Sequence, residues 1–237
     1  MSNDRPVSLV TGAGSGIGLA TARRLAAAGH RLALAGRRLE PLRDAGAGFG
    51  SEGEDWVALP TDVGIPEQAQ ALVGRVLDAM GRVDALVNNA GWTPMKPVAE
   101  HSLDDVAKIF AVNAIGPTLL TIDAVNAMRD KGGRIVNISS IASGDPFPGL
   151  SVYGGAKAAL NTLTKGLAGE LGESSTIKVF CVAPGAVETA LLRSILPADQ
   201  LPTEACLTPD AVAEVIAACV TGERDAETGQ TIWLPSP

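Results

Sequence analysis

Short apolar runs and longer stretches of helical periodicity alternate along this chain. The apolar runs lack strict alternation of apolar and polar positions, which is typical of strands in a parallel sheet covered on both faces. The predicted strands are Val7–Val10, Arg31–Ala35, Trp56–Leu59, Val83–Val87, Arg134–Ile138, Lys178–Ala183 and Thr231–Leu234. The predicted helices are Ile17–Ala28, Leu39–Ala47, Glu67–Met80, Leu103–Arg129, Val152–Leu171 and Pro209–Val220.

Capping residues support several predicted helix ends. Gly29 and Gly81 follow the first and third helices, where a left-handed residue commonly ends a helix. Ser102 and Thr208 offer hydroxyl caps at two helix starts, the second followed by Pro209. Alternating strands and helices with short connections imply right-handed crossovers in a parallel sheet. The chain, residues 1–237, is therefore predicted to form a single Rossmann-type, doubly wound α/β domain with about seven parallel strands.

Length and charge limit the classes of function. The 237 residues carry a formal net charge of −7, which argues against nucleic acid or an anionic membrane surface as the main partner. No uninterrupted apolar run approaches the ~20 residues that span a bilayer. The first residues, Met1–Pro6, have no apolar signal core, so we expect a cytoplasmic protein without a membrane partner.

The residues that commonly bind metals or form disulfides are sparse. Cys181, Cys206 and Cys219 are odd in number, widely spaced and in apolar surroundings, as reduced cysteines of a core are. His30 and His101 are too few and too isolated for a zinc site. We therefore expect neither a metal site nor a disulfide framework.

The first candidate site is a glycine-rich loop directly after the first strand. It reads Gly12-Ala13-Gly14-Ser15-Gly16-Ile17-Gly18, which departs from the G-x-G-x-x-G spacing because position 17 is isoleucine. Residues without a Cβ let a pyrophosphate approach the backbone, and a helix start offers free N–H groups and a positive dipole. The loop indicates a dinucleotide site; the alternative is a glycine-rich turn without a ligand.

The end of the second strand bears on which dinucleotide binds. An acidic residue usually meets a ribose with free hydroxyls there, but this chain has Arg37 and Arg38 and no acid before Glu40. A guanidinium can bind a 2′-phosphate, so NADP(H) is favoured and NAD(H) is the second candidate. The alternative is that both arginines begin a helix in solvent. Asp62, after the third strand, either meets the adenine amino group or caps the next helix.

The second candidate site is the pair Tyr153 and Lys157 in a predicted helix. Residues four apart share one helix face, and a neighbouring ammonium favours the phenolate. A free phenol titrates near ~10, so it needs such help to exchange a proton near neutrality. Ser139 or Ser140, after the fifth strand, could donate a hydrogen bond to a substrate carbonyl. The alternative is an ordinary amphipathic helix, although Tyr153 is the only tyrosine in the chain.

These motifs resemble the classical short-chain dehydrogenase/reductase family over nearly the whole chain. The resemblance rests on the loop Thr11–Gly18, the motif Asn88-Asn89-Ala90-Gly91, the segment Pro184–Thr189, and Asn113, Ser140, Tyr153 and Lys157, which match the family's catalytic tetrad. Ser140 is preferred to Ser139 because it precedes Tyr153 by thirteen residues, the usual family interval.

The resemblance implies roles for the tetrad and an extended cofactor site. Tyr153 would act as general acid or base, Lys157 would lower the phenol pKa and hold the nicotinamide ribose, Ser140 would orient the substrate oxygen, and Asn113 would support a water relay. Glycine and proline beside Asn113, at Gly116-Pro117, predict an irregular helix there. The predicted cofactor-binding residues are Gly12, Ser15, Gly16, Ile17, Gly18, Arg37, Arg38, Asp62, Val63, Asn89, Ala90, Gly91, Tyr153, Lys157, Pro184, Gly185, Val187 and Thr189.

The substrate is the least determined part of the prediction. The segment Leu191–Leu207 (the lid) resembles the family's mobile cover over the substrate, and Trp92, Phe147, Leu150 and Leu192 are candidates for an apolar pocket. We expect a small-molecule carbonyl or alcohol substrate, with a 3-oxoacyl thioester reductase as the narrower alternative.

Small residues on the long helices resemble the family's helical dimer seam, which predicts a homo-dimer or homo-tetramer.

Two other functions use the same fold. One is a non-catalytic regulatory protein that binds the cofactor. The other is an epimerase or dehydratase that uses the Tyr-Lys pair. The complete tetrad argues against the regulatory protein, and the loop spacing and short C-terminal region argue against the epimerase.

Overall fold

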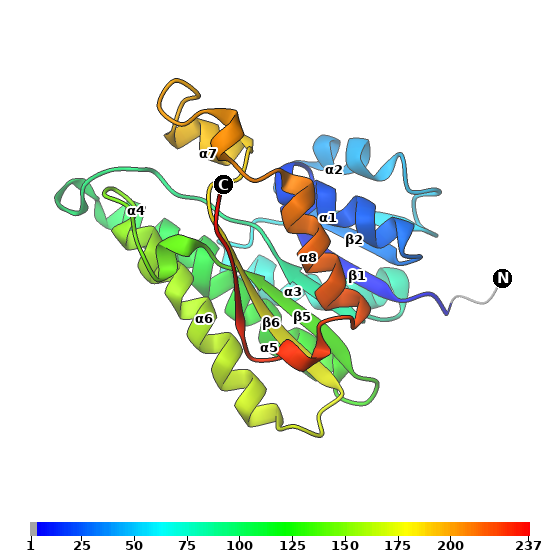
Figure 1. The fold of residues 1–237 in the computed structure, drawn as a ribbon. Helices are drawn as coiled ribbons and strands as arrows, with labels where there is room; N and C mark the ends of the chain where they lie inside the picture. Colours follow the sequence, from blue (N-terminus) through cyan, green and yellow to red (C-terminus); the bar gives the residue numbers. More distant parts are fainter. Residues whose placement is uncertain (1–3) are drawn as a thin grey trace.

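The computed structural model describes residues 4–237 and contains one seven-stranded sheet in which every strand pairs in parallel. The strand order is β3-β2-β1-β4-β5-β6-β7 (Figure 1). The strands are β1 (Val7–Thr11), β2 (Arg31–Gly36), β3 (Trp56–Pro60), β4 (Ala85–Asn88), β5 (Gly133–Ile138), β6 (Ile177–Pro184) and β7 (Thr231–Leu234). The order reverses beside β1, so β1 and β4 flank a crevice at the carboxyl edge, where open α/β sheets bind ligands.

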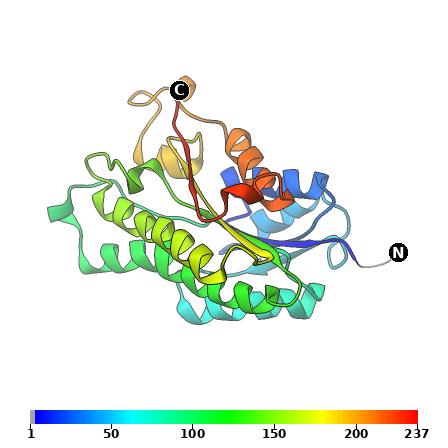
Figure 2. The same cartoon turned by 60° about the horizontal axis from the view of Figure 1, so that its bottom comes forward.

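Helices cover both faces of the sheet. They are α1 (Gly16–Ala27), α2 (Leu39–Gly46), α3 (Pro66–Met80), α4 (Leu103–Phe110), α5 (Gly116–Met128), α6 (Ser151–Leu171), α7 (Ala190–Ile195) and α8 (Pro209–Thr221). One apolar core joins α1, α2 and α8 to the sheet, and a second joins α3 and α5 to its other face, where α6 also packs (Figure 2). The doubly wound α/β prediction is confirmed.

The capping residues predicted from the sequence occur at the ends of the helices. Gly29 and Gly81 lie just past α1 and α3 with φ of 87° and 80°, in the left-handed region. The Ser102 hydroxyl accepts from the Asp105 N–H at the start of α4, and the Thr208 hydroxyl accepts from Ala211 N at the start of α8. The capping alternative for Asp62 is wrong, because the residue that precedes α3 is Ile65.

The long helix predicted over Leu103–Arg129 is interrupted. A π-helical turn, Ala111–Ile115, separates α4 from α5, and α5 ends at Met128. Pro117 at the first turn of α5 lacks an N–H, which breaks the regular ladder. A Cβ on Gly116 would lie 2.1 Å from the Val63 carbonyl oxygen, so the helix passes close to the end of β3. The predicted irregularity at Gly116-Pro117 is therefore confirmed, with Asn113 inside the π turn.

One helical stretch, Leu103–Met128, is long and apolar enough to cross a membrane by length and composition alone, although it contains no uninterrupted apolar run of that length. Its most apolar window has a mean hydropathy of 1.3, and 44% of that window is buried within the protein. Leu120, Ala124 and Met128 on its inner face are fully buried in the core. Core packing therefore explains the apolar residues on the buried side of this stretch, but not the exposed Ile115 and Ile122.

Candidate active site

The carboxyl edge of the sheet opens into a cavity of about 970 Å³. The predicted site residues that line it are Gly12, Ser15, Gly16, Ile17, Arg37, Arg38, Asp62, Val63, Asn89, Ala90, Gly91, Ser140, Tyr153, Lys157, Pro184, Gly185, Val187 and Thr189. Segments distant in sequence thus meet at one cavity. Two predicted residues, Gly18 and Asn113, lie behind its wall rather than on it.

The glycine loop is shaped by positions where a side chain would not fit. Gly12 and Gly16 have φ of 67° and 53°, in the region that favours glycine. A Cβ at Gly18 would lie 2.3 Å from the Gly12 carbonyl oxygen and 2.6 Å from Asn89 Nδ2. Only glycine therefore fits at position 18. Gly18 packs beneath the loop and does not form the surface on which a phosphate would lie.

Asn89 and Thr11 fix this loop to the end of β4. Asn89 Nδ2 donates to the Thr11 carbonyl at 2.9 Å, and the Thr11 hydroxyl accepts from the N–H groups of Asn89 and Ala90 at 3.0 Å each. Asn89 is therefore a structural bridge as well as a cavity-lining residue. The Asn89 amide thus already has a hydrogen-bond partner in the loop backbone without any ligand.

The far end of the cavity holds Arg37, Arg38, Asp62 and Val63. Both arginine side chains are exposed, and within residues 4–237 neither forms an ion pair or a hydrogen bond. They are therefore free to meet an anion. The Asp62 carboxylate accepts from Gly64 N at 2.9 Å, which holds the turn after β3.

Tyr153 and Lys157 lie one turn apart on α6, with the Lys157 ammonium 5.7 Å from the centre of the phenol ring. Lys157 is buried and donates to the Ile138 carbonyl at 2.7 Å. Burial lowers the pKa of Lys157 to about 8, against a smaller opposing attraction to Cys181.

Burial raises the pKa of Tyr153 to about 12, and its hydrogen bond with the Ser140 side chain only partly opposes that shift. The expected lowering of the phenol pKa by Lys157 is thus not found in the protein alone.

The two serines after β5 have different environments. The Ser139 hydroxyl is buried and donates to the Lys157 carbonyl at 3.1 Å, so it connects the end of β5 to the backbone of α6. Both serines line the cavity, but Ser140 is only partly buried, and its hydroxyl accepts from Ala142 N at 3.2 Å. The geometry therefore favours Ser140 as the group that meets a substrate oxygen.

Asn113 is fully buried, so the alternative of a solvated helix residue does not apply. Its Nδ2 donates to the Trp92 carbonyl at 2.6 Å and to the Ile109 carbonyl at 2.8 Å. A Cβ at Gly91 would lie 3.2 Å from Asn113 Oδ1 and 3.8 Å from Lys157 Nζ, so both polar groups border the same small space.

Sequence reasoning missed the C-terminal tail. Pro235, Ser236 and Pro237 line the cavity, and the Ser236 hydroxyl accepts from Ala186 N at 2.7 Å. A Cβ at Gly185 would lie 2.4 Å from that hydroxyl oxygen. The tail therefore holds the segment after β6 in place, and no local pattern in Pro-Ser-Pro indicates this.

The part of the cavity beside Tyr153 and the lid is the substrate half. Leu196 and Leu201 of the predicted lid line it together with the four apolar residues predicted there, whereas sequence reasoning missed Met95. Lys108 lines it as well, with its ammonium 4.1 Å from the centre of the Trp92 ring, a cation–π distance. An apolar lining with few polar groups is typical of a small-molecule site.

A family model described as short chain dehydrogenase matches residues 6–200 of this chain. The chain belongs to the short-chain dehydrogenase family. Dehydrogenase/reductase SDR family member 4 of Bos taurus is 35% identical to it over 97% of this chain and 85% of the relative. Members of the family are NAD(P)-dependent oxidoreductases, and this chain is such an enzyme.

Solved structures of short-chain dehydrogenases agree with this assignment. A 3-ketoacyl-(acyl-carrier-protein) reductase from Brucella melitensis, complexed with NADH, has a TM-score of 0.88 and 29% identity, covering 99% of this chain and 98% of the other. A short chain dehydrogenase from Burkholderia cenocepacia, in complex with NADP, has a TM-score of 0.88 and 32% identity, covering 99% and 97%.

Proposed function

We propose that this short-chain dehydrogenase interconverts a carbonyl compound and a secondary alcohol, with Tyr153 as general acid or base and with NADP(H) preferred to NAD(H). The observation that carries the proposal is the meeting of Tyr153 and Ser140 with the glycine loop at one cavity. A proton donor, an oxygen-orienting hydroxyl and a phosphate-sized backbone cradle are then within one ligand's length. The location proposed for the enzyme is the cytoplasm.

The residues of the cavity fit a nicotinamide dinucleotide. Gly12 and Gly16 leave their backbone open at the start of α1, where free N–H groups and the helix dipole favour a pyrophosphate. Asp62 and Val63 would hold the adenine. The other end would lie against Lys157 and the predicted residues after β4 and β6: Asn89, Ala90, Gly91, Pro184, Gly185, Val187 and Thr189. When bound, the cofactor supplies or accepts a hydride.

The preference for NADP(H) rests on Arg37 and Arg38. Both are exposed, and within residues 4–237 neither has a partner, so a 2′-phosphate would meet guanidinium groups that need not break another contact. We expect Arg37→Asp to shift the ratio of NADPH to NADH affinity toward NADH. An unchanged ratio in the variant would contradict the assignment.

Tyr153 and Ser140 would handle the proton and the substrate oxygen. In reduction the Tyr153 hydroxyl gives its proton to the carbonyl oxygen, which becomes the alcohol oxygen; in oxidation the phenolate takes that proton back. Ser140 donates a hydrogen bond to the same oxygen. With its pKa raised to about 12 by burial, Tyr153 is protonated near neutrality but is a weak acid in the protein alone. A positive charge near the ring would be needed to lower that pKa for proton exchange in either direction.

Lys157 and Asn113 would return the proton from solvent. Their polar atoms border one small space beside Gly91, which is the arrangement a bridging water requires. A proton lost by Tyr153 could then be replaced through Lys157 without opening the cavity.

A comparison of wild type with Tyr153→Phe tests the proposal. The variant keeps the ring but removes the proton donor, so we expect turnover of ketones to fall by at least about 100-fold, the usual contribution of general acid–base catalysis. NADPH affinity, measured by quenching of cofactor fluorescence, should stay within about twofold. Equal turnover by the two proteins would refute the role of Tyr153.

A 3-oxoacyl thioester reductase is the narrower candidate function. The similarity to a 3-ketoacyl-(acyl-carrier-protein) reductase and the apolar lining from Trp92, Phe147 and the lid favour it. A higher kcat/KM for a 3-oxoacyl N-acetylcysteamine thioester than for a 2-alkanone of equal length would select it. Tight NADPH binding without turnover of any carbonyl would instead select the regulatory protein.

A further inference from the structure

The lid is closed at its base by backbone hydrogen bonds. Leu207 N donates to the Ala186 carbonyl at 2.8 Å, and Glu188 N donates to the Leu207 carbonyl at 2.9 Å. Between these points the chain leaves the sheet, forms the short helix α7, and returns through an irregular segment. The backbone hydrogen bonds inside this segment are local, such as those from Arg193 N to the Thr189 carbonyl and from Gln200 N to the Pro197 carbonyl. Above the base, contacts between distant parts of the segment therefore depend on side chains.

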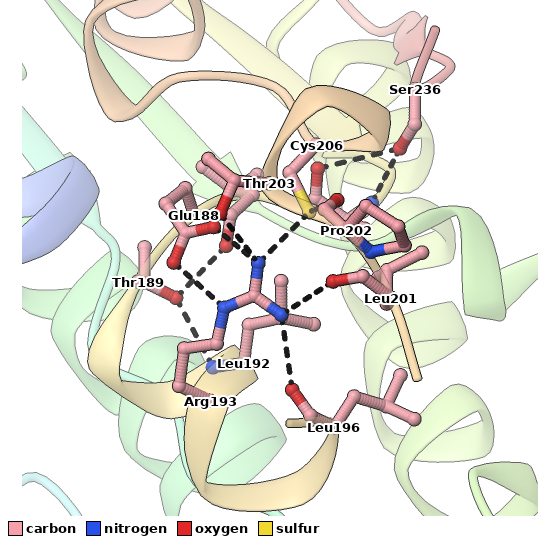
Figure 3. Close-up of polar contacts among 12 residues, drawn as sticks. Glu188, Thr189, Leu192, Arg193, Leu196, Leu201, Pro202, Thr203, Cys206 and Ser236 are labelled. Atoms are coloured by element: carbon pink, nitrogen blue, oxygen red, sulfur yellow. Dashed lines mark hydrogen bonds and ion pairs between the residues drawn. The ribbon is translucent and has the colours of Figure 1, made fainter. Parts of the chain in front are cut away.

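One side chain occupies the centre of the lid. Arg193 Nε donates to Glu188 at 2.8 Å, and a second nitrogen of the same guanidinium pairs with the other oxygen of that carboxylate (Figure 3). Its Nη1 donates to the carbonyls of Leu196 and Leu201 at 3.2 Å and 2.7 Å. Its Nη2 also reaches the Thr203 hydroxyl at 3.3 Å. Arg193 thus connects the start, middle and end of the lid.

The other side of the lid forms part of the active site. Leu191, Leu192, Ile195, Leu196 and Leu201 line the cavity, whereas Arg193 does not. The carbonyl groups that Arg193 binds therefore belong to two of the residues whose side chains face the substrate half.

This set of Arg193 contacts (the clamp) also lies next to the glycine loop. Thr189 directly follows Glu188, and its hydroxyl caps α7 by accepting from Leu192 N at 3.2 Å. Its methyl carbon lies 3.1 Å from the position that a Cβ on Gly16 would take. Holding Glu188 thus holds the residue that contacts the glycine loop.

We propose that Arg193 is a positioning residue, which holds the lid in the shape that presents its leucine side chains to the substrate before any substrate binds. Fixing a loop in its bound conformation removes the ordering cost from the binding step. The contacts require arginine, because a planar guanidinium can serve a carboxylate and several carbonyls at once and a lysine ammonium cannot. The part of this inference that concerns substrate rests on the proposed function.

The expected effect depends on substrate length. A long ketone such as 2-octanone would contact the lid leucines, whereas 2-butanone would be held mainly at Ser140 and Tyr153. In Arg193→Met we expect KM for 2-octanone to rise about tenfold, the factor that corresponds to 1.4 kcal/mol. KM for 2-butanone and both kcat values should stay within about threefold, because the chemical step does not use the lid. A general loss of stability would not separate the two ketones in this way.

Hydrogen exchange tests the clamp without any turnover. Backbone exchange in residues 188–207 should be faster in Arg193→Met than in wild type, with the rest of the sheet unchanged. Arg193→Lys should fall between the two proteins, since it keeps the charge opposite Glu188 and loses the carbonyl contacts.

The matched control is Arg134→Met. Arg134 forms the same two-pronged pair with Asp225, at 2.9 Å and 2.7 Å, on the opposite edge of the sheet. The Arg134→Met variant should leave hydrogen exchange in the lid and the ratio of the two KM values unchanged. Unchanged lid exchange in Arg193→Met, or equal KM changes for both ketones, would overturn the inference. If wild type reduces neither ketone, the proposed function fails while the exchange result still decides for or against the clamp.

Discussion

At the scale of single residues, Lys157 on α6 shows how burial changes a pKa. Lys157 is nearly inaccessible, and burial lowers its pKa to about 8 from the ordinary 10.5. Between these values the unfolded chain binds a proton that the folded protein does not. The linkage relation then makes the free energy of unfolding rise with pH in that window, and the destabilising cost of Lys157 is greatest below pH 8.

We therefore expect wild type to gain stability relative to Lys157→Met as the pH rises. The difference in unfolding free energy between the two proteins should change by about 1 kcal/mol from pH 7 to pH 9. Urea denaturation at several pH values measures it. Tyr153 and Cys181 are present in both proteins, so their own titration largely cancels. Parallel pH profiles for the two proteins would show that Lys157 has an ordinary pKa in the folded state.

The sequence predicted which residues would gather but not how they would interact. Tyr153 and Lys157 could be paired from their spacing because a helix has a fixed period. The Ile138 carbonyl that holds Lys157, and the burial that shifts both pKa values, depend on how β5 packs against α6. Such tertiary contacts leave no local sequence signal.

At the scale of elements, the turn from β1 into α1 allows the sharpest test. Gly18 lies within the first turn of α1, where a Cβ would overlap the Gly12 carbonyl and the Asn89 amide. Gly18→Ala should therefore cost roughly 1–3 kcal/mol of stability through overpacking, and should weaken NADPH binding because the loop must shift.

Gly74 provides the matched control. It lies in the interior of α3, and nothing lies within 4 Å of a Cβ built there. Gly74→Ala should add about 0.5–1 kcal/mol of stability and leave NADPH affinity unchanged. Thermal denaturation and fluorescence titration measure both properties. Similar behaviour of the two alanine variants would mean that Gly18 is not under steric constraint.

Elements with a regular period were predicted almost completely, and irregular ones were not. All seven strands and the main helices occur where the pattern placed them, within one or two residues. The exact extent of the π turn and the return of the tail onto Ala186 were not foreseen. Both depend on contacts between distant segments, at Val63 and at Ser236, rather than on local preference.

At the scale of the whole molecule, the outer face of α4, α5 and α6 remains to be accounted for (Figure 2). Leu103 of α4, Ile115 of the π turn and Ile122 of α5 are 82%, 48% and 52% exposed. On α6, Gly155 and Gly166 have open space where a Cβ would be, so another helix could approach closely. Exposed apolar side chains on neighbouring helices are typical of a protein–protein interface.

We therefore predict a homo-dimer or homo-tetramer that buries this face, as the small residues of the helices already indicated. Light scattering after gel filtration should give at least twice the monomer mass, 24.2 kDa. Ile122→Lys would place a charge in the interface and should yield monomers at low micromolar concentration. Leu77→Lys is the control, because Leu77 is also partly exposed, at 37%, but lies on α3 rather than on α4, α5 or α6. A wild-type protein that elutes at monomer mass would contradict the prediction and leave these apolar side chains in solvent.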